Sequence, residues 1–446
     1  MVLFNIKKGF DLKIEGSPIP EIEELDNPAF VAFLPERIPY IKPKLIVEQG
    51  DRVRIGSTLF IDKRNPDIKF LSPGSGKIEK INFGSRRVIK EIIIKLDNRE
   101  EFIEFDVNKF SGGKKHNRDD IIKSMMDGGI WPFIRELPFR DIAVPDYMPQ
   151  NLIVSLDNKE PFQPDPQVYL KEEIDLFRTG MSVLKNLVKN VYVHTSKDFV
   201  NIDKTDNLVT HKFAGSYPAD DPGVLLHHIR KDPSENRSWY INGQDVILIG
   251  SFFSTGKYPV KRTVVLAGSL AGKRMYYKTR IGVPINNVIE GRIMDENRAR
   301  LVAGGIFRGY TASRESFLGF YETSLALLPE GGKSETFGFL RAGFDRPSYT
   351  KTFLSFFNRL PLTADCSLHG EERACVNCGA CAKVCPVDIL PQFAFKSIIA
   401  DDIEEALSHG MLDCVECGLC SYVCTSKIDL CALFKNAKQA YYKDKT

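Results

Sequence analysis

The sequence has no apolar run near the length of a membrane-spanning helix, which needs about 18 residues. Its opening stretch is interrupted by Lys7, Lys8, Asp11 and Lys13, so it also lacks the apolar segment of a signal peptide. These absences argue against a membrane-spanning or secreted chain. We therefore expect a cytoplasmic location, with any contact to a membrane made through partner subunits.

Neither sign of charge is in excess, because 61 Lys and Arg residues are balanced by 58 Asp and Glu residues, for a net charge of +3. A nucleic-acid-binding protein concentrates basic residues on one face, so we expect no nucleic-acid partner. No Ser-His-Asp set, paired carboxylate or Walker motif stands out. Nucleophilic catalysis and nucleotide hydrolysis therefore have no candidate residues.

Cysteine is missing from the first 365 residues, although the whole chain holds ten. Nine of the ten fall between Cys375 and Cys431, and the tenth is Cys366. Such clustering in a chain without secretory features favours a metal site over disulfides.

At 446 residues the chain is too long for one hydrophobic core, and we predict a multidomain α+β protein. Residues 1–105 are predicted to be β, because 44–62 and 70–84 alternate short apolar runs with glycine turns. This pattern resembles the barrel-sandwich fold of biotinyl and lipoyl carriers. The turn between its halves carries Lys63 without a neighbouring Met, so we interpret Lys63 as unmodified.

Residues 119–258 alternate predicted helices with predicted strands, which favours a parallel α/β domain. Helical spacing begins at Asp119 and returns over 166–185. The predicted strands are 151–156, 190–195 and 244–250.

Residues 259–330 contain short strand-like runs that each end at a glycine, which indicates a small mixed sheet of β-grasp type. These runs are 262–268, 273–282 and 299–305. Residues 331–364 are expected to connect this sheet to a helical domain over 365–446, which two cysteine motifs interrupt.

The cysteine motifs share the rhythm C-x-x-C-x-x-C-x-x-x-C, which is typical of two 4Fe-4S clusters that exchange their fourth ligands. One cluster is assigned to Cys375, Cys378, Cys381 and Cys424, and the other to Cys385, Cys414, Cys417 and Cys420. Zinc ribbons use separated CxxC pairs and do not need this rhythm, so zinc is the weaker alternative.

Smaller features of the motifs carry further predictions. Gly379 and Gly418 lie where the backbone must approach sulfur closely, and Pro386 is expected to begin the next helix. Thr425 stands where the second motif usually has Pro, which removes no ligand. Cys366 and Cys431 fall outside the rhythm and are predicted to be packed residues.

The spacer between the motifs is predicted to be helical, with Ile399, Ile403 and Leu407 on one face. Its length resembles that of the α-helical ferredoxins, in which two clusters lie close enough to exchange electrons.

Taken together, segments along the whole chain resemble the A subunit of the sodium-translocating NADH:quinone oxidoreductase and the related C subunit of the Rnf complex. These segments are 8–18, 42–53, 72–88, 128–139, 241–256 and 264–269. The resemblance implies a β-grasp domain of SLBB type and an α/β domain related to the flavoprotein subunit of complex I. It also implies membrane and flavoprotein partner subunits.

Two departures from these families are informative. The Rnf subunit has a glycine-rich FMN and NADH loop, whereas residues 127–133 are short and contain Trp131 and Phe133. We therefore expect no FMN on this chain. Familiar A subunits have degraded cysteine motifs, whereas this chain keeps all eight ligands. An Rnf-type subunit and a scaffold without redox function stay open as alternatives.

The resemblance also implies contact with quinone, for which Arg37, Tyr40, Arg135, Phe139 and Arg140 are the candidates. Ordinary packing of these segments is the alternative interpretation. The pair His227 and His228 is expected in a strand, where adjacent side chains face opposite ways and cannot chelate one metal together. The pair Arg86 and Arg87 is expected in a solvated turn.

Overall fold

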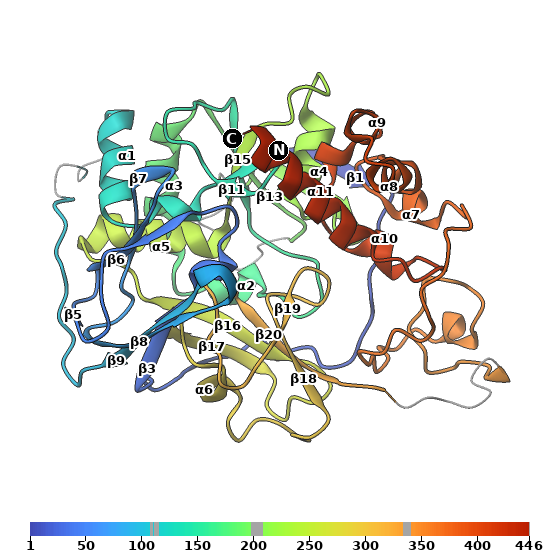
Figure 1. The fold of residues 1–446 in the computed structure, drawn as a ribbon, viewed down its shortest axis with the longest axis horizontal. Coiled ribbons are helices and arrows are strands. Elements are labelled where there is room, and N and C mark those ends of the chain that lie inside the picture. Colours follow the sequence, from blue (N-terminus) through green and yellow to red (C-terminus); the bar gives the residue numbers. More distant parts are fainter. Residues whose placement is uncertain (108–109, 111–115, 198–207, 333–339, 446) are drawn as a thin grey trace.

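The computed structural model describes residues 1–446 except 108–109, 111–115, 198–207, 333–339 and 446 (Figure 1). The predicted connection over 331–364 therefore lies partly outside the described residues. Four sheets and a helical C-terminal region make up the fold, with the cysteine-bearing helices at one end (Figure 1).

Two small sheets form the N-terminal β module, with the strand orders β3-β9-β8-β5 and β4-β6-β7. Side chains of β9 alternate, so that Ile92 and Ile94 are fully buried in the main core while Ile93 packs against another cluster. The strands are β3 (Phe30–Phe33), β4 (Pro43–Leu45), β5 (Arg52–Val53), β6 (Thr58–Asp62), β7 (Asn65–Leu71), β8 (Gly76–Phe83) and β9 (Ile89–Leu96). The turn from β6 to β7 exposes Lys63.

The first two strands belong to other sheets. Strand β1 (Val2–Ile6) pairs in parallel with β14 (His211–Gly215), and β2 (Ile22–Glu24) pairs in parallel with β17 (Met275–Arg280). The arm between them contacts both regions, and its Phe10 N–H donates to the Tyr217 carbonyl at 2.9 Å. Strands β1 and β2, which were predicted to belong to the N-terminal β domain, therefore connect the seven-stranded sheet to the six-stranded sheet.

The seven-stranded sheet has the order β1-β14-β13-β12-β15-β10-β11, with five parallel strands and an antiparallel edge. Leu152 and Val154 face the helices α1, α3 and α5, whereas Ile153 faces α4. Its further strands are β10 (Arg135–Leu137), β11 (Asp141–Ile142), β12 (Asn151–Ser155), β13 (Asn190–Thr195) and β15 (Ser238–Asn242). The helices are α1 (Arg118–Asp127), α2 (Pro166–Tyr169), α3 (Ile174–Leu187), α4 (Pro222–Ile229) and α5 (Gly243–Thr255).

Two predictions for this domain are wrong. Residues 244–250 are helix α5, and the strand is the preceding β15, because a short apolar run that is buried on all sides fits either element. His227 and His228 lie in α4, not in a strand. That helix begins where the Asp221 carboxylate accepts from the Gly223 N–H, followed by Pro222 in the first turn.

The six-stranded mixed sheet has the order β19-β18-β20-β16-β17-β2 and follows the predicted short strands closely. Its remaining elements are β16 (Lys261–Ala267), α6 (Ile285–Ile289), β18 (Ala299–Ala303), β19 (Tyr310–Ala312) and β20 (Ser324–Pro329).

The cysteine-bearing region is helical, as predicted, but its helices begin and end elsewhere. Ile399 ends one helix and is 63% exposed, and Asp401 turns the chain with φ 57°, so Ile399, Ile403 and Leu407 share no helix face. Pro391, not Pro386, begins the helix after the first motif. The helices are α7 (Ala380–Val384), α8 (Pro391–Ile399), α9 (Ile403–Ser408), α10 (Leu419–Tyr422) and α11 (Leu430–Lys445). Short 3-10 turns are η1 (Pro35–Arg37), η2 (Ser85–Arg87), η4 (Trp131–Phe133), η6 (Leu354–Phe357) and η7 (Met411–Asp413).

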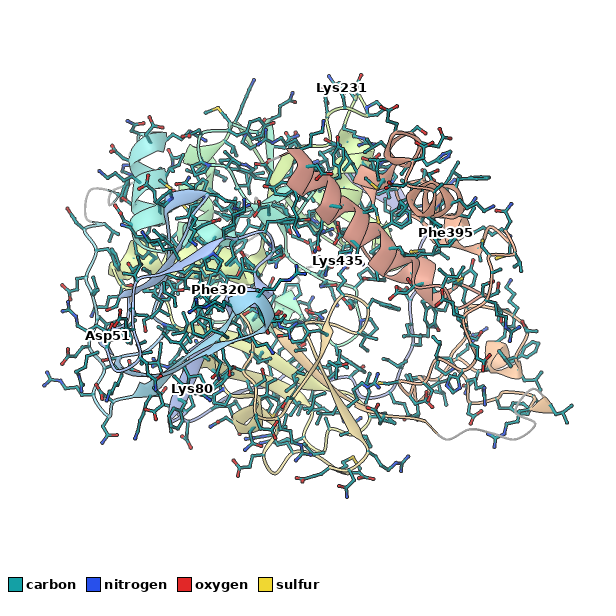
Figure 2. The ribbon with its side chains drawn as sticks, in the orientation of Figure 1. Asp51, Lys80, Lys231, Phe320, Phe395 and Lys435 are labelled. Carbon is teal, nitrogen blue, oxygen red and sulfur yellow. The ribbon has the colours of Figure 1, made fainter. Side chains whose placement is uncertain are left out.

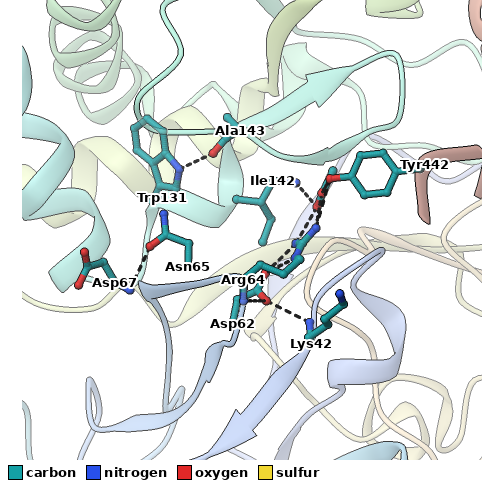
Figure 3. Close-up of polar contacts among 10 residues, drawn as sticks. Lys42, Asp62, Arg64, Asn65, Asp67, Trp131, Ile142, Ala143 and Tyr442 are labelled. Atoms are coloured by element: carbon teal, nitrogen blue, oxygen red, sulfur yellow. Dashed lines mark hydrogen bonds and ion pairs between the residues drawn. The ribbon is translucent and has the colours of Figure 1, made fainter. Parts of the chain in front are cut away.

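An ion-pair network joins three regions of the fold where α11 crosses the molecule (Figure 3). Arg64, in the turn after β6, donates to Asp62 at 2.6 Å and to Asp141 of β11 at 2.5 Å. The Tyr442 hydroxyl of α11 donates to Asp141 at 2.6 Å. Asp62 and Asp141 are buried, so this network fastens the cysteine-bearing region to both the β module and the α/β domain.

We expect Tyr442→Phe to lower the free energy of unfolding by about 1 kcal/mol, because it removes one hydrogen bond to a buried carboxylate. Tyr441→Phe, on the same helix, is the matched control and should change it by less than about 0.5 kcal/mol. Urea denaturation of both variants measures the difference. Equal effects of the two substitutions would contradict the role given to the Tyr442 hydroxyl.

Candidate iron–sulfur centres

The first candidate centre is a cavity of about 350 Å³ between α7 and the segment after α10. Cys375, Cys378, Cys381 and Cys424 all line it. Gly379 begins α7 with φ 71°, a conformation that L side chains rarely adopt, and this turn directs the preceding cysteine loop around the cavity. Cys378 is exposed, so this centre lies at the surface. Phe395, labelled in Figure 2, belongs to the same hydrophobic cluster as Cys381.

The second candidate centre is a cavity of about 380 Å³ beneath α11. The cysteines lining it are Cys381, Cys385, Cys414, Cys417, Cys420 and Cys431. The last cysteine of each motif thus lies at the cavity formed by the other motif, and Cys381 lines both cavities. Cys431, predicted to be a packed residue, lies against this second cavity, whereas Cys366 packs against a hydrophobic cluster that includes Val265 and Ala326.

The donor sets fit cubic clusters better than single ions. Among the described residues, no group of three or more His, Cys, Asp or Glu is close enough to hold one metal ion. A four-iron cube needs four thiolates spread around a larger volume; the first cavity is lined by four cysteines and the second by six. Burial raises the pKa of the Cys417 thiol to about 12 and also raises the pKa of Cys414 and Cys420. Iron would have to displace these protons when it binds.

Buried cations surround the second cysteine loop. Lys438 of α11 is fully buried, and its Nζ donates to the carbonyls of Pro138 and Cys414 at 2.9 Å each and to Glu416 at 2.8 Å. Burial raises the pKa of Glu416, but the charges of Lys438 and Arg140 outweigh this effect and lower it. These contacts fix the loop backbone next to the cysteines.

Arg140 and Arg308 extend this charged environment into the α/β domain. Arg140 donates to the Val415 carbonyl at 3.0 Å and to the buried Asp221 at 2.8 Å. Arg308, from the loop before β19, also pairs with Asp221 at 2.7 Å. The Tyr217 hydroxyl donates to the Cys417 carbonyl at 2.8 Å. The second cysteine loop is therefore held by groups from its own helical region and from the α/β domain, and Arg308 pairs with the same Asp221 as Arg140.

Asp220 is buried beside this network, and its Oδ1 has no hydrogen-bond partner in the structure. Burial raises the pKa of Asp220 to about 7, with Asp221 and Asp157 adding to the effect and Arg308 opposing it. The folded protein therefore holds a proton on Asp220 over a pH range in which the unfolded chain has lost it.

This proton predicts a pH dependence. Because the folded pKa is raised, the contribution of Asp220 to stability falls as pH rises from about 4 towards 7 and above. Between pH 5.5 and pH 8 the loss should be about 2 kcal/mol. We expect Asp220→Asn to flatten this dependence, measured by urea denaturation at both pH values. If the free energy of unfolding changed equally with pH in the variant and in the wild type, Asp220 would be ionised in the folded protein at both pH values.

The five candidate quinone residues do not form one cleft. The Arg37 guanidinium lies 3.7 Å from the Tyr310 ring centroid, and Arg135 lies between the rings of Tyr240 and Tyr321. Arg140 belongs to the second centre, as described above.

Tyr40 and Phe139 share a neighbour, because the ring of each contacts Tyr442 of α11, with centroid distances of 4.4 and 4.8 Å. Arg140 also lines a cavity of about 310 Å³ with Pro138 and Leu226.

The segment at 127–133 is part of the core. Trp131 and Phe133 are fully buried, and the Trp131 Nε1–H donates to the Ala143 carbonyl at 2.8 Å (Figure 3). A side chain at Gly128 would overlap the ring of Phe252, so helix α1 ends in tight packing.

Sequence reasoning missed Lys438, Arg308 and the acidic pair Asp220 and Asp221. One signal was available for Lys438: it lies four residues after Phe434 on the apolar stripe of α11, where a lysine requires buried partners. Arg308 carries no comparable signal, because its partners are distant in the sequence.

Comparison with known proteins covers most of the chain. Three models match by the descriptions NqrA N-terminal barrel-sandwich hybrid domain, NqrA second alpha/beta domain and NQRA C-terminal domain, at residues 4–97, 116–258 and 263–314. The A subunit of the Na(+)-translocating NADH-quinone reductase from Yersinia pestis bv. Antiqua (strain Angola) is 31% identical over 92% of each chain. The corresponding proteins of Neisseria meningitidis serogroup B and Pseudomonas aeruginosa are 32% identical over the same shares. This chain belongs to the family of A subunits of the Na(+)-translocating NADH-quinone reductase.

Membership in this A-subunit family confirms the predicted fold class of barrel-sandwich, α/β, SLBB-type and helical ferredoxin domains. A 4Fe-4S dicluster domain model matches residues 374–428, which include all eight motif cysteines. A solved chain of an NAD+-reducing [NiFe]-hydrogenase aligns over 75% of this chain and 64% of its own, with a TM-score of 0.40 and 13% identity, which is too weak to bear on the fold. In the described part of the chain, no helix combines the length and apolar character needed to cross a bilayer.

Proposed function

We propose that this family member is an electron-transfer subunit that relays electrons through two 4Fe-4S clusters. Cys375, Cys378, Cys381 and Cys424 would hold one cluster, and Cys385, Cys414, Cys417 and Cys420 the other. The observation that supports this most strongly is the pair of cavities that share Cys381, the first lined by four cysteines and the second by six, with the last cysteine of each motif at the cavity of the other motif. When bound, such clusters accept and release single electrons.

The chain's own residues would give the two centres different tasks. The first centre lies at the surface, where the exposed Cys378 suits exchange with a partner. The second lies under α11 and is held by Lys438, Arg140 and Tyr217, which fix its loop against the α/β domain. Electrons would therefore pass between the first centre, which lies at the surface, and the second centre, which lies against the α/β domain.

We further propose that the chain works in a membrane-associated complex of the kind its relatives are named for, the Na(+)-translocating NADH-quinone reductase. It would lie on the cytoplasmic side, bound to membrane and flavoprotein subunits. We propose that Tyr40 and Phe139, whose rings both contact Tyr442, make the contact with quinone.

Anaerobic purification of the full chain tests the relay. We expect about eight irons per chain and a low-potential EPR signal on reduction. Zinc, or no metal, in place of iron would overturn the proposal, and so would a silent EPR spectrum, which a scaffold would give. If the iron-loaded chain binds FMN or oxidises NADH on its own, the Rnf-type alternative is favoured.

A further inference from the structure

Residues 340–360 carry an unusual concentration of positive charge. They contain Arg341, Arg346, Lys351 and Arg359, and one acid, Asp345, which gives a net charge of +3. The whole chain also has a net charge of +3, so the remaining 57 basic and 57 acidic residues cancel. The net charge of the protein thus equals that of this one segment.

The same segment exposes large apolar side chains. Phe357 is 77% exposed, Leu360 72%, Phe344 66% and Phe356 53%. A soluble surface shows such residues singly, whereas here they fall within 17 residues of one another. Lys351 lies over the Phe356 ring at 5.2 Å, so a cation lies beside one of these exposed apolar side chains.

The segment is a folded loop with a fixed base. Leu354 and Ser355 N–H groups donate to the carbonyls of Ala342 and Gly343 at 2.9 and 3.0 Å, which closes the loop. Midway between these two pairs, the Tyr349 ring packs edge-on against Phe10 at 5.4 Å, in the hydrophobic cluster that Cys417 also contacts. The exposed aromatic residues are therefore held in place without being covered by the rest of the described chain.

We propose that residues 340–360 bind the surface of an anionic lipid bilayer, with Phe356 and Phe357 entering the headgroup region. Phe and Leu side chains enter the boundary between headgroups and acyl chains when basic residues accompany them at the membrane surface. The cations add electrostatic attraction to anionic lipid, each worth about a fivefold change in binding. A protein partner is the less favoured occupant, because lysine is depleted at protein interfaces, whereas Lys351 lies over the exposed Phe356 ring.

Vesicle co-sedimentation of the full iron-loaded chain tests this proposal. One set of vesicles contains phosphatidylcholine alone, and the other adds about a third phosphatidylglycerol, which supplies the negative surface potential. We expect binding to the anionic vesicles only, with a loss as salt increases. Lys351→Gln with Arg359→Gln should weaken it about 25-fold, which is fivefold for each charge. Phe356→Ser with Phe357→Ser should weaken it to a similar degree.

The control carries the same kinds of change at another exposed place, Met294→Ser with Arg298→Gln, where both side chains are about two-thirds exposed. It should bind as the wild type does. Iron content is measured for every variant, so loss of vesicle binding at full iron content is separate from failure of the electron relay. Wild-type protein that ignores anionic vesicles, or binds membranes only when membrane subunits are present, would overturn the proposal.

Discussion

Replacing Cys375 and Cys424 together by alanine should leave about four irons per chain, whereas replacing Cys375 and Cys385 together should remove nearly all iron. In the first pair both ligands belong to one centre, because Cys375 and Cys424 line the same cavity. In the second pair each centre loses one ligand, since Cys385 lines the other cavity. Iron analysis and EPR of anaerobically purified variants measure the outcome.

The two double variants separate exchanged ligands from unexchanged ones. If each motif held its own cluster, the Cys375 and Cys385 variant would keep one cluster and the Cys375 and Cys424 variant would lose both. Cys366→Ala is the matched control, because it lies outside both cavities and should retain about eight irons. Cys431→Ala also tests whether the one cysteine at the second cavity that lies outside both motifs is dispensable.

Lys438→Met should destabilise the cysteine-bearing region by about 3–5 kcal/mol, because it leaves the buried carboxylate of Glu416 without its partner. It also leaves two carbonyl groups, of Pro138 and Cys414, without their donor. Urea denaturation followed by the visible absorbance of the clusters reports on this region. The destabilisation should appear as release of iron from the second centre at a lower urea concentration than in the wild type.

The exposed Lys435, one turn earlier on α11, supplies the control (Figure 2). Lys435→Met should change stability by less than about 0.5 kcal/mol. Adding Glu416→Gln to Lys438→Met should recover part of the loss, because the unpaired charge is removed. Equal destabilisation by Lys435→Met and Lys438→Met would contradict the role given to the buried contacts of Lys438.

Local patterns predicted much of this structure. Strand β13 has the bounds that its alternation predicted, 190–195, and the cysteine spacing placed Cys424 and Cys385 at opposite cavities. Prediction failed where burial on all sides removes periodicity, as in α5.

Contacts between residues that are distant in the sequence could not be predicted either. Arg308 meets Asp221 across 87 positions, and Lys438 meets Pro138 across 300. No local rule connects such positions, so the charged surroundings of the second centre emerge only from the fold.

The N-terminal arm sets the order in which the chain can be completed during synthesis. Strand β1 can pair only after residues 211–215 have been made. The Glu15 N–H finds its acceptor, the Leu362 carbonyl, only after residue 362 has been made. A nascent chain therefore leaves its first residues unpaired until nearly half of it has been made, and the seam around Leu362 closes only as the cysteine motifs emerge. A polypeptide fused ahead of Met1 would extend from this late-closing edge.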